Sequence, residues 1–202
     1  KENIPPEGRF IFASNHPLGA LDGVALIRFF GHFYSGKIKF LVNDLLMHIK
    51  PLAPVFLPIN KYGSQAKESS LQINNAYESD EQMLIFPAGL CSRLQHGKIK
   101  DLEWKKTFIA KAVQSQRDII PIYFEGRNST FFYRFAQIRK CIGLKFNIEL
   151  IYLPDEMFNS KNKTFDIYIG KPIPWQTFDK SKSLQEWAQI VKEKVYQIKK
   201  NQ

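Results

Sequence analysis

Short runs of apolar residues, each bounded by turn residues, recur along the chain and predict β-strands. The runs cover residues 9–13, 37–42, 55–59, 83–86, 119–124, 147–153 and 165–169. Most of them are apolar almost without interruption, where a strand exposed on one face would alternate apolar and polar residues. Continuous apolar character is typical of strands that are covered on both faces. We therefore expect a sheet with helices on each side.

Helical patterns occupy the segments between these runs. The predicted helices cover residues 22–30, 65–79, 104–116 and 184–199. The last is the clearest, because Leu184, Trp187, Val191 and Val195 repeat at helical spacing behind a Ser183 cap. Strands that alternate with helices predict an α/β fold with a mixed, largely parallel sheet flanked by helices. We find no internal repeat and no linker, so we expect residues 1–202 to form a single domain.

Composition narrows the class of protein further. With 44% hydrophobic residues the chain is too apolar to be disordered. No stretch approaches the roughly 18 consecutive apolar residues that a spanning helix needs. Cys91 and Cys141 are isolated, which argues against a disulfide framework. The chain begins with Lys1 and not with methionine, so we expect a native N-terminal segment to precede it.

The chain carries a formal net charge of +10, which requires an anionic counterpart. Nucleic acid, an anionic lipid surface and an acidic or phosphorylated substrate carrier all meet that requirement. Charge alone does not choose among them.

The first segment with candidate chemistry is Ser14–Gly23, which links a predicted strand to a predicted helix. Open α/β sheets bind their ligands at such strand ends. His16 and Asp22 in this loop can form the pair needed for acid–base catalysis, in which the carboxylate orients the imidazole and the imidazole takes a proton. The alternative is that they are ordinary turn and cap residues.

Three further strand ends carry weaker signals. Leu84–Arg93 ends in a Pro/Gly turn, where Gly89 permits close backbone approach and Arg93 can hold an anion. The alternative there is a plain strand exit with a solvated arginine. Val55–Lys61 ends in a polar pair, and Ile119–Ser129 has a proline inside its strand, which more often marks an edge or a bulge.

Taken together, the four segments resemble the motif blocks of the glycerolipid acyltransferases, the lysophosphatidic-acid acyltransferase-like family. The sequences NHPLGALDG, FLVNDLL, FPAGLCSR and GKIKDLEWKKTF look more closely like a bacterial subgroup. That subgroup contains hemolysin-like proteins and acyltransferases of lyso-ornithine and lyso-glycine lipids. The resemblance is specific from about Gly8 to Ser129 and looser beyond, and it implies a glycerol-3-phosphate acyltransferase-like fold.

The resemblance also implies roles for individual residues. His16 matches the catalytic base and Asp22 its partner carboxylate. The residues that match substrate-binding positions are Asn60, Lys61, Phe86, Pro87, Gly89, Ser92 and Arg93.

Two departures from the family pattern matter. Five residues separate His16 from Asp22 where the family usually has four, a spacing that the bacterial subgroup shares. Ala88 replaces the family's glutamate, and Arg93 is displaced by two positions. Because that block contacts the head group in relatives, an aminoacyl head group is favoured over glycerol phosphate.

The implied reaction moves a fatty acyl chain from acyl-CoA or acyl-acyl-carrier-protein to the hydroxyl of a lyso-lipid, without a bound cofactor. Lysophosphatidic acid is the competing acceptor. A nucleophilic role for Cys91 is disfavoured, since no histidine lies near it in sequence. A metal site is not expected, because His32, His48 and His96 lack ligand-like spacing with carboxylates or cysteines.

Aromatic residues beside cations predict contact with a membrane surface. They occur in Phe29–Tyr34 and Phe131–Phe135, and the alternative for each run is that its aromatics are core residues. The second run is favoured as a membrane contact because five bulky residues including an arginine cannot all face one core. We expect a peripheral enzyme at the cytoplasmic face of the bacterial inner membrane, with an anionic bilayer as its partner and acyl carrier protein as a further candidate. The alternatives are a nucleic-acid-binding module, for which no helix-turn-helix or single-strand-binding signature is found, and a lipid-binding protein without catalysis.

Overall fold

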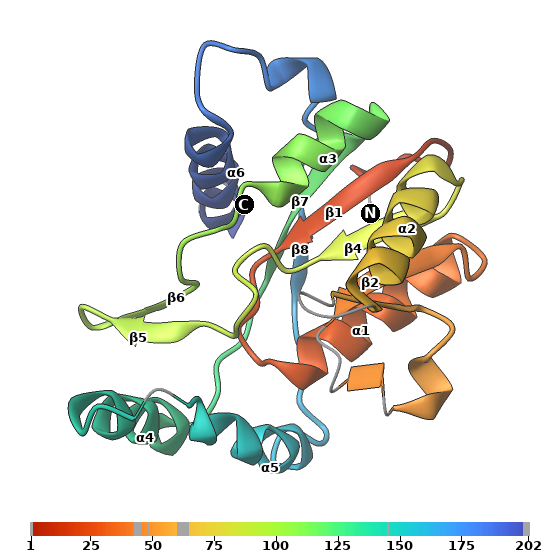
Figure 1. Ribbon diagram of the computed structural model, residues 1–202. Helices are drawn as coiled ribbons and strands as arrows, with labels where there is room; N and C mark the ends of the chain where they lie inside the picture. Colours follow the sequence, from red (N-terminus) through yellow and green to blue (C-terminus); the bar gives the residue numbers. More distant parts are fainter. Residues whose placement is uncertain (1, 43–45, 48, 60–64, 145, 200–202) are drawn as a thin grey trace.

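The computed structural model describes residues 2–42, 46–47, 49–59, 65–144 and 146–199, and among these a six-stranded sheet forms the centre of the fold (Figure 1). The strand order is β3-β2-β4-β1-β7-β8, and neighbours run parallel except for the antiparallel pair β7–β8. The strands are β1 (Phe10–Ser14), β2 (Ile38–Val42), β3 (Phe56–Pro58), β4 (Gln82–Ile85), β7 (Asp118–Phe124) and β8 (Ile167–Ile169). A separate antiparallel hairpin consists of β5 (Arg93–Gln95) and β6 (Lys98–Lys100).

Helices fill the connections between strands. The α-helices are α1 (Ala20–Phe33), α2 (Gln65–Glu78), α3 (Thr107–Ser115), α4 (Thr130–Cys141), α5 (Leu153–Phe158) and α6 (Leu184–Ile198), and the short 3₁₀ helices are η2 (Lys50–Leu52), η3 (Ile148–Tyr152) and η4 (Trp175–Thr177). Within the described residues, no helix has both the length and the apolar character needed to cross a membrane.

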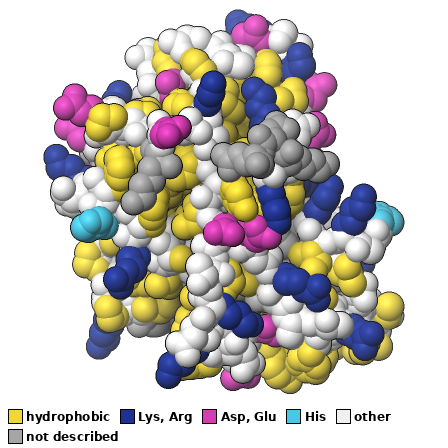
Figure 2. Space-filling model, turned by 180° about the vertical axis from the view of Figure 1, so that it is seen from behind, with side chains coloured by type: hydrophobic (Ala, Val, Ile, Leu, Met, Phe, Trp, Pro, Cys, Tyr) yellow, Lys and Arg dark blue, Asp and Glu magenta, His cyan; other side chains and the backbone are white. Residues whose placement is uncertain are grey.

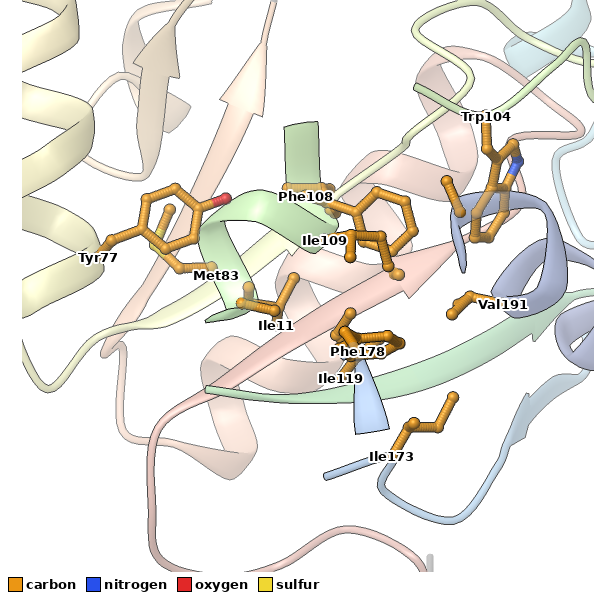
Figure 3. Packing of buried hydrophobic residues seen from close by; sticks show 14 of the residues in the cluster. Ile11, Tyr77, Met83, Trp104, Phe108, Ile109, Ile119, Ile173, Phe178 and Val191 are labelled. Atoms are coloured by element: carbon orange, nitrogen blue, oxygen red, sulfur yellow. The ribbon is translucent and has the colours of Figure 1, made fainter. Parts of the chain in front are cut away.

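The central strand β1 is buried along its whole length, as the continuous apolar run predicts. Its side chains alternate between two hydrophobic clusters, because successive residues of a strand point to opposite faces. Ile11 and Ala13 pack with α2, α3 and α6, in the cluster shown in Figure 3. Phe10 and Phe12 pack with α1. The predicted α/β fold, with helices on both faces of a largely parallel sheet, is confirmed.

Helix α6 follows its predicted apolar stripe. Val191 and Val195 are buried in the first cluster, with Leu184 packed against it. Ser183 caps the helix as expected, and Glu186 returns the hydrogen bond in a capping box.

The prediction of a strand over 147–153 is wrong. These residues form η3 and the start of α5. Glu149 lies inside the run and its carboxylate is buried against Arg93 and Arg139, while Pro154 occupies the first turn of α5. A short apolar run cannot by itself distinguish a strand from a packed helical turn.

The β5–β6 hairpin falls in a segment with no predicted strand. Its strands are mostly polar, so no apolar run marks them in the sequence. In the turn between the strands, His96 and Gly97 both have positive φ, at 48° and 75°. Two positive φ angles in succession are the requirement of the tightest hairpin turn.

Arg117, the residue before β7, connects α2 and the segment after it to the sheet. Its fully buried guanidinium donates to four backbone carbonyls, those of Ala76, Tyr77, Ser79 and Glu81. Burial lowers its pKa to about 10, which still leaves it charged at neutral pH.

Replacing Arg117 with methionine is expected to lower the free energy of unfolding by about 3 kcal/mol, because several buried carbonyls lose their donor. Urea denaturation measures the loss. Arg9→Met is the matched control, since Arg9 donates to the carbonyls of Glu78 and Ser115 from a half-buried position. The control should lose about 1 kcal/mol or less, and equal losses in both variants would contradict the assignment.

Candidate active site

The carboxyl ends of three neighbouring strands bring the motif loops together. β1 lies between β4 and β7, with Ala13 paired to Ile85 and Ser14 paired to Ile122. The loops that follow these strands therefore leave the same edge of the sheet, where open α/β folds bind ligands. Asn15 joins two of them, because its side chain bonds both the N–H and the C=O of Phe124.

His16 and Asp22 form the predicted pair. The Nδ1 atom of His16 lies 3.1 Å from each carboxylate oxygen of Asp22. The turn that closes the five-residue interval includes Gly19, whose φ of 82° is unfavourable for other residues. Asp22 is fully buried, whereas the His16 side chain is 15% exposed. With its Nδ1–H donated to the carboxylate, the ring has Nε2 free to accept a proton.

Backbone groups fix the Asp22 carboxylate. The N–H of Leu18 donates to Oδ2 at 2.9 Å, and the N–H of Gly23 donates to Oδ1 at 2.8 Å. Asp22 also lies in the first turn of α1, where the helix dipole favours a negative charge. The carboxylate is therefore oriented before any substrate arrives.

Phe86, the residue after β4, holds the imidazole from its face. The two rings stack with centroids 3.9 Å apart and an interplanar angle of 16°. Phe40 in turn packs edge-on against Phe86 at 5.3 Å. His16 is thus constrained in its plane by Asp22 and across its plane by Phe86. The resemblance places Phe86 in the acceptor-binding block, and here it also orients the imidazole.

The turn after Phe86 requires a glycine. Pro87 and Gly89 lie within it, and the N–H of Gly89 donates to the Phe86 carbonyl at 2.9 Å with φ at 70°. A Cβ at position 89 would lie 2.6 Å from the Lys105 Nζ atom. The Lys105 ammonium therefore lies directly over this turn, and no carboxylate of the described chain forms an ion pair with it. Lys105 is a candidate binding residue that the sequence analysis missed.

Ser92 joins this block to the histidine loop. Its N–H donates to the His16 carbonyl at 2.7 Å, and its hydroxyl donates to Asp101 Oδ1 at 2.6 Å. Ser92 is buried, and both its N–H and its hydroxyl bond to protein groups. It therefore holds the His16 loop in position from the protein interior.

Arg93 is engaged by protein groups. Its guanidinium pairs with the buried Glu149 carboxylate at 2.8 Å, donates to the Cys91 carbonyl at 3.1 Å and lies over the Phe132 ring. The side chain is 11% exposed. It thus links the motif block to the segment that contains η3, and a contact with substrate remains a prediction.

Cys91 is built into the protein interior. It packs in a small cluster with Phe132 and Tyr133, and burial raises the pKa of its thiol despite the neighbouring Arg93. Because the thiolate is the nucleophilic form, a thiol kept protonated is a poor nucleophile. The environment agrees with the expectation that Cys91 does not carry the acyl group.

Asp101 is a second residue that the sequence analysis missed, although it lies in the quoted motif GKIKDLEWKKTF. Its carboxylate accepts from the His16 N–H at 3.2 Å, from the Ser92 hydroxyl and from Trp104 Nε1 at 2.8 Å. It is 1% exposed, and burial raises its pKa although these donors oppose the shift. Asp101 therefore connects the histidine loop, the Phe86–Ser92 block and the segment before α3.

Two predicted substrate-binding residues, Asn60 and Lys61, lie outside the described residues. Among the described residues, no group of three or more histidine, cysteine or acidic side chains is arranged to hold a metal ion.

Asp101→Asn is expected to reduce turnover roughly 10- to 100-fold, because an amide offers fewer acceptor sites and the His16 loop loses its exact placement. Steady-state kinetics measure the change in turnover, and urea denaturation measures any change in the free energy of unfolding, so that the two can be told apart. Glu103→Gln is the matched control, since Glu103 is an exposed acid two residues away. Turnover that is unchanged in Asp101→Asn would rule out this positioning role.

Comparison with known proteins adds an independent line of information. A family model described as "Acyltransferase" matches residues 1–202. The lyso-glycine lipid O-acyltransferase of Bacteroides thetaiotaomicron is 57% identical over 98% of this chain and 72% of its own length. The protein of the same name from Phocaeicola vulgatus is 54% identical over 98% of this chain and 71% of its own length.

A solved structure is similar in fold. The crystal structure of the 1-acyl-sn-glycerophosphate (LPA) acyltransferase PlsC from Thermotoga maritima aligns with a TM-score of 0.57 over 98% of this chain and 69% of that chain. The two sequences are 19% identical, so this likeness concerns the architecture alone.

Proposed function

Since this chain belongs to the acyltransferase family, we propose that it transfers a fatty acyl chain from an acyl thioester to the hydroxyl of a lyso-lipid with an amino-acid head group. The family resemblance drawn from the sequence motifs is confirmed. The observation that carries the acceptor class is the identity of 57% and 54% to two lyso-glycine lipid O-acyltransferases. The formed His16–Asp22 pair supports catalysis and argues against a purely lipid-binding role.

In the proposed reaction, Nε2 of His16 accepts the proton of the lyso-lipid hydroxyl as its oxygen attacks the thioester carbonyl carbon. Asp22 stabilises the imidazolium that forms. The tetrahedral intermediate then expels the thiolate, and His16 returns the proton to the sulfur. The products are an ester and a free thiol. No acyl-enzyme forms, because the hydroxyl is itself the nucleophile.

We assign the anionic end of the acceptor to the turn at Gly89. An amino acid that is linked to its fatty chain through nitrogen presents a carboxylate. The Lys105 ammonium, which forms no ion pair with the described acids, lies over this turn. Ala88 brings no competing negative charge to the same turn, where the family usually has glutamate. A lysine ammonium binds a carboxylate as a point charge and makes no demand for a planar fork.

The proposed donors are acyl-CoA and acyl-acyl-carrier-protein. Both are anionic, and the net charge of +10 attracts either one. Because both thioesters are made in the cytoplasm, we place the reaction at the cytoplasmic face of the inner membrane, with acyl carrier protein as a candidate partner.

His16→Gln is expected to lower turnover by about 10² to 10⁴-fold, the usual contribution of general-base catalysis. Asp22→Asn should lower it by at least about 10²-fold, since the imidazolium loses its counter-charge and the ring its fixed tautomer. His32→Gln is the control, because His32 is exposed on α1. Near-normal turnover in His16→Gln would refute the mechanism.

The acceptor is tested with purified protein, supplied with acyl-CoA or acyl-acyl-carrier-protein and offered lyso-glycine lipid or lysophosphatidic acid. We expect faster transfer to lyso-glycine lipid. Lys105→Met should raise the KM for that acceptor roughly tenfold and leave kcat nearly unchanged, because it removes a head-group contact that is made equally in the bound substrate and in the transition state. Lys106→Met is the neighbouring control. Preference for lysophosphatidic acid would overturn the proposed acceptor class.

A further inference from the structure

Exposed apolar residues gather on one outer part of the molecule. The structure leaves twelve large hydrophobic side chains exposed among the described residues, and seven of them fall between positions 131 and 158. We call these seven residues the docking face: Phe131, Ile138, Ile142, Leu144, Phe146, Ile151 and Phe158. Phe146 is 80% exposed, Ile151 75% and Phe158 70%. Apolar side chains concentrated in this way mark an interaction surface.

Helix α4 shows that the exposure is not a failure of core packing. Its inner side already packs, with Phe132 and Tyr133 buried in the cluster around Cys91. Its outer side carries a second apolar stripe at helical spacing, which runs through Phe131, Phe135, Ile138 and, just beyond the helix, Ile142. Since the core occupies only one of the two apolar faces of α4, the other face is available to bind a partner.

The outer stripe is ordered by its own contacts. Phe131 and Phe135 stack with centroids 5.8 Å apart, and Tyr152 of η3 packs edge-on against both at 5.1 and 5.5 Å. The sequence predicts that the run Phe131–Phe135 contacts a membrane surface. Phe131 points outward and is available for such a contact, whereas Phe132 is 0% exposed and belongs to the interior. In the other run, Phe29–Tyr34, Phe30 and Tyr34 belong to the core.

Cations surround the docking face. Five are exposed in the same region, namely Arg127, Arg134, Lys140, Lys161 and Lys163. The acids between positions 127 and 163 offset these cations only in part. Glu149 is buried between Arg93 and Arg139, and Asp155 and Glu156 place two negative charges against the five exposed cations. Figure 2 shows hydrophobic and basic side chains intermixed over the lower part of the molecule, the part that α4 and α5 occupy in Figure 1.

This combination of side chains selects one occupant. A two-fold contact with a second copy would bring like charges together, which is unfavourable. A nucleic acid would match the cations but would leave the aliphatic side chains exposed to water. An anionic bilayer satisfies both, because apolar side chains enter the boundary of the acyl chains while lysine and arginine meet the head groups.

The docking face is joined directly to the catalytic loop. The Leu153 side chain of α5 packs against Gly19, where a Cβ would approach it to 2.7 Å. Asn128, just before α4, donates to the Pro17 carbonyl at 3.4 Å. Arg93 links the FPAGLCSR block to Glu149 of η3. A surface that binds the α4–α5 region therefore lies beside His16.

We propose that the docking face inserts into the head-group region of an anionic bilayer and presents the His16 loop to lyso-lipid held there. The proposal that the docking face binds a bilayer depends only on the side chains of that face. The proposal that it presents the His16 loop to lyso-lipid rests on the proposed function.

Vesicle co-sedimentation without substrate tests the binding. The full chain should partition at least tenfold better onto vesicles of phosphatidylglycerol and phosphatidylcholine than onto phosphatidylcholine alone, and the triple variant Phe146→Ser, Ile151→Ser, Phe158→Ser should lose at least tenfold. The triple variant Ile49→Ser, Ile59→Ser, Leu71→Ser is the matched control, because these residues are also exposed but lie outside both aromatic runs. It should bind within twofold of the wild type. Wild-type protein that stays in the supernatant, or equal losses in both variants, would overturn the docking face.

The remaining outcomes separate the two proposals. In the docking-face variant, turnover should fall on lyso-lipid embedded in vesicles but not on a short-chain lyso-lipid dissolved as monomers. If wild-type protein binds vesicles yet transfers no acyl group to either substrate, the proposed function fails and the docking face stands. A change in molar mass by light scattering in the docking-face variant would instead assign the surface to a second copy, and a salt-sensitive shift of RNA lost in that variant would assign it to nucleic acid.

Discussion

The contact between His16 Nδ1 and the Asp22 carboxylate is the interaction on which the chemistry of this protein depends. It joins the loop after β1 to the first turn of α1, and both are held by burial in the same hydrophobic cluster on one face of the sheet. The contact needs a tight turn at Gly19 and two backbone N–H groups that aim the carboxylate. Phe86 then fixes the imidazole from its face, so the ring arrives in one orientation with a single nitrogen free. Such preorganisation is what lets a neutral imidazole act as a base without rearrangement.

Two buried acids hold the surrounding loops in place. Asp101 gathers donors from the histidine loop, from Ser92 and from Trp104, while Glu149 pairs with Arg93 and Arg139. A buried carboxylate is stable only when it is paired or hydrogen-bonded. Each acid therefore holds in place the donors and cations that contact it. The same Glu149 anchors the region that carries the exposed apolar surface. Catalytic loop and outer surface are therefore parts of one connected arrangement.

The sequence predicts the layers of the fold well, because burial on both faces leaves a direct trace in apolar runs such as 9–13 and 119–124. It predicts the His16–Asp22 pair because the two residues are close in the chain and the motif is specific. It does not predict the partners of Arg93 or the role of Asp101, since Glu149 is 56 residues from Arg93 and Asp101 is 85 residues from His16. The 147–153 run is ambiguous for a related reason, because a short apolar run fits a strand and a helical turn equally well, and the partners of Glu149 lie outside the run in the sequence.

The central claim is that Asp22 holds His16 with Nδ1 protonated and Nε2 available for the lyso-lipid hydroxyl. Nitrogen-15 NMR of the histidine-labelled protein, at a pH where the ring is neutral, reports the tautomer directly. His16 should be found as the Nδ1–H tautomer in the wild type and should lose that preference in Asp22→Asn. A wild-type His16 that carries its proton on Nε2 would contradict the claim, because the nitrogen required as base would already be occupied.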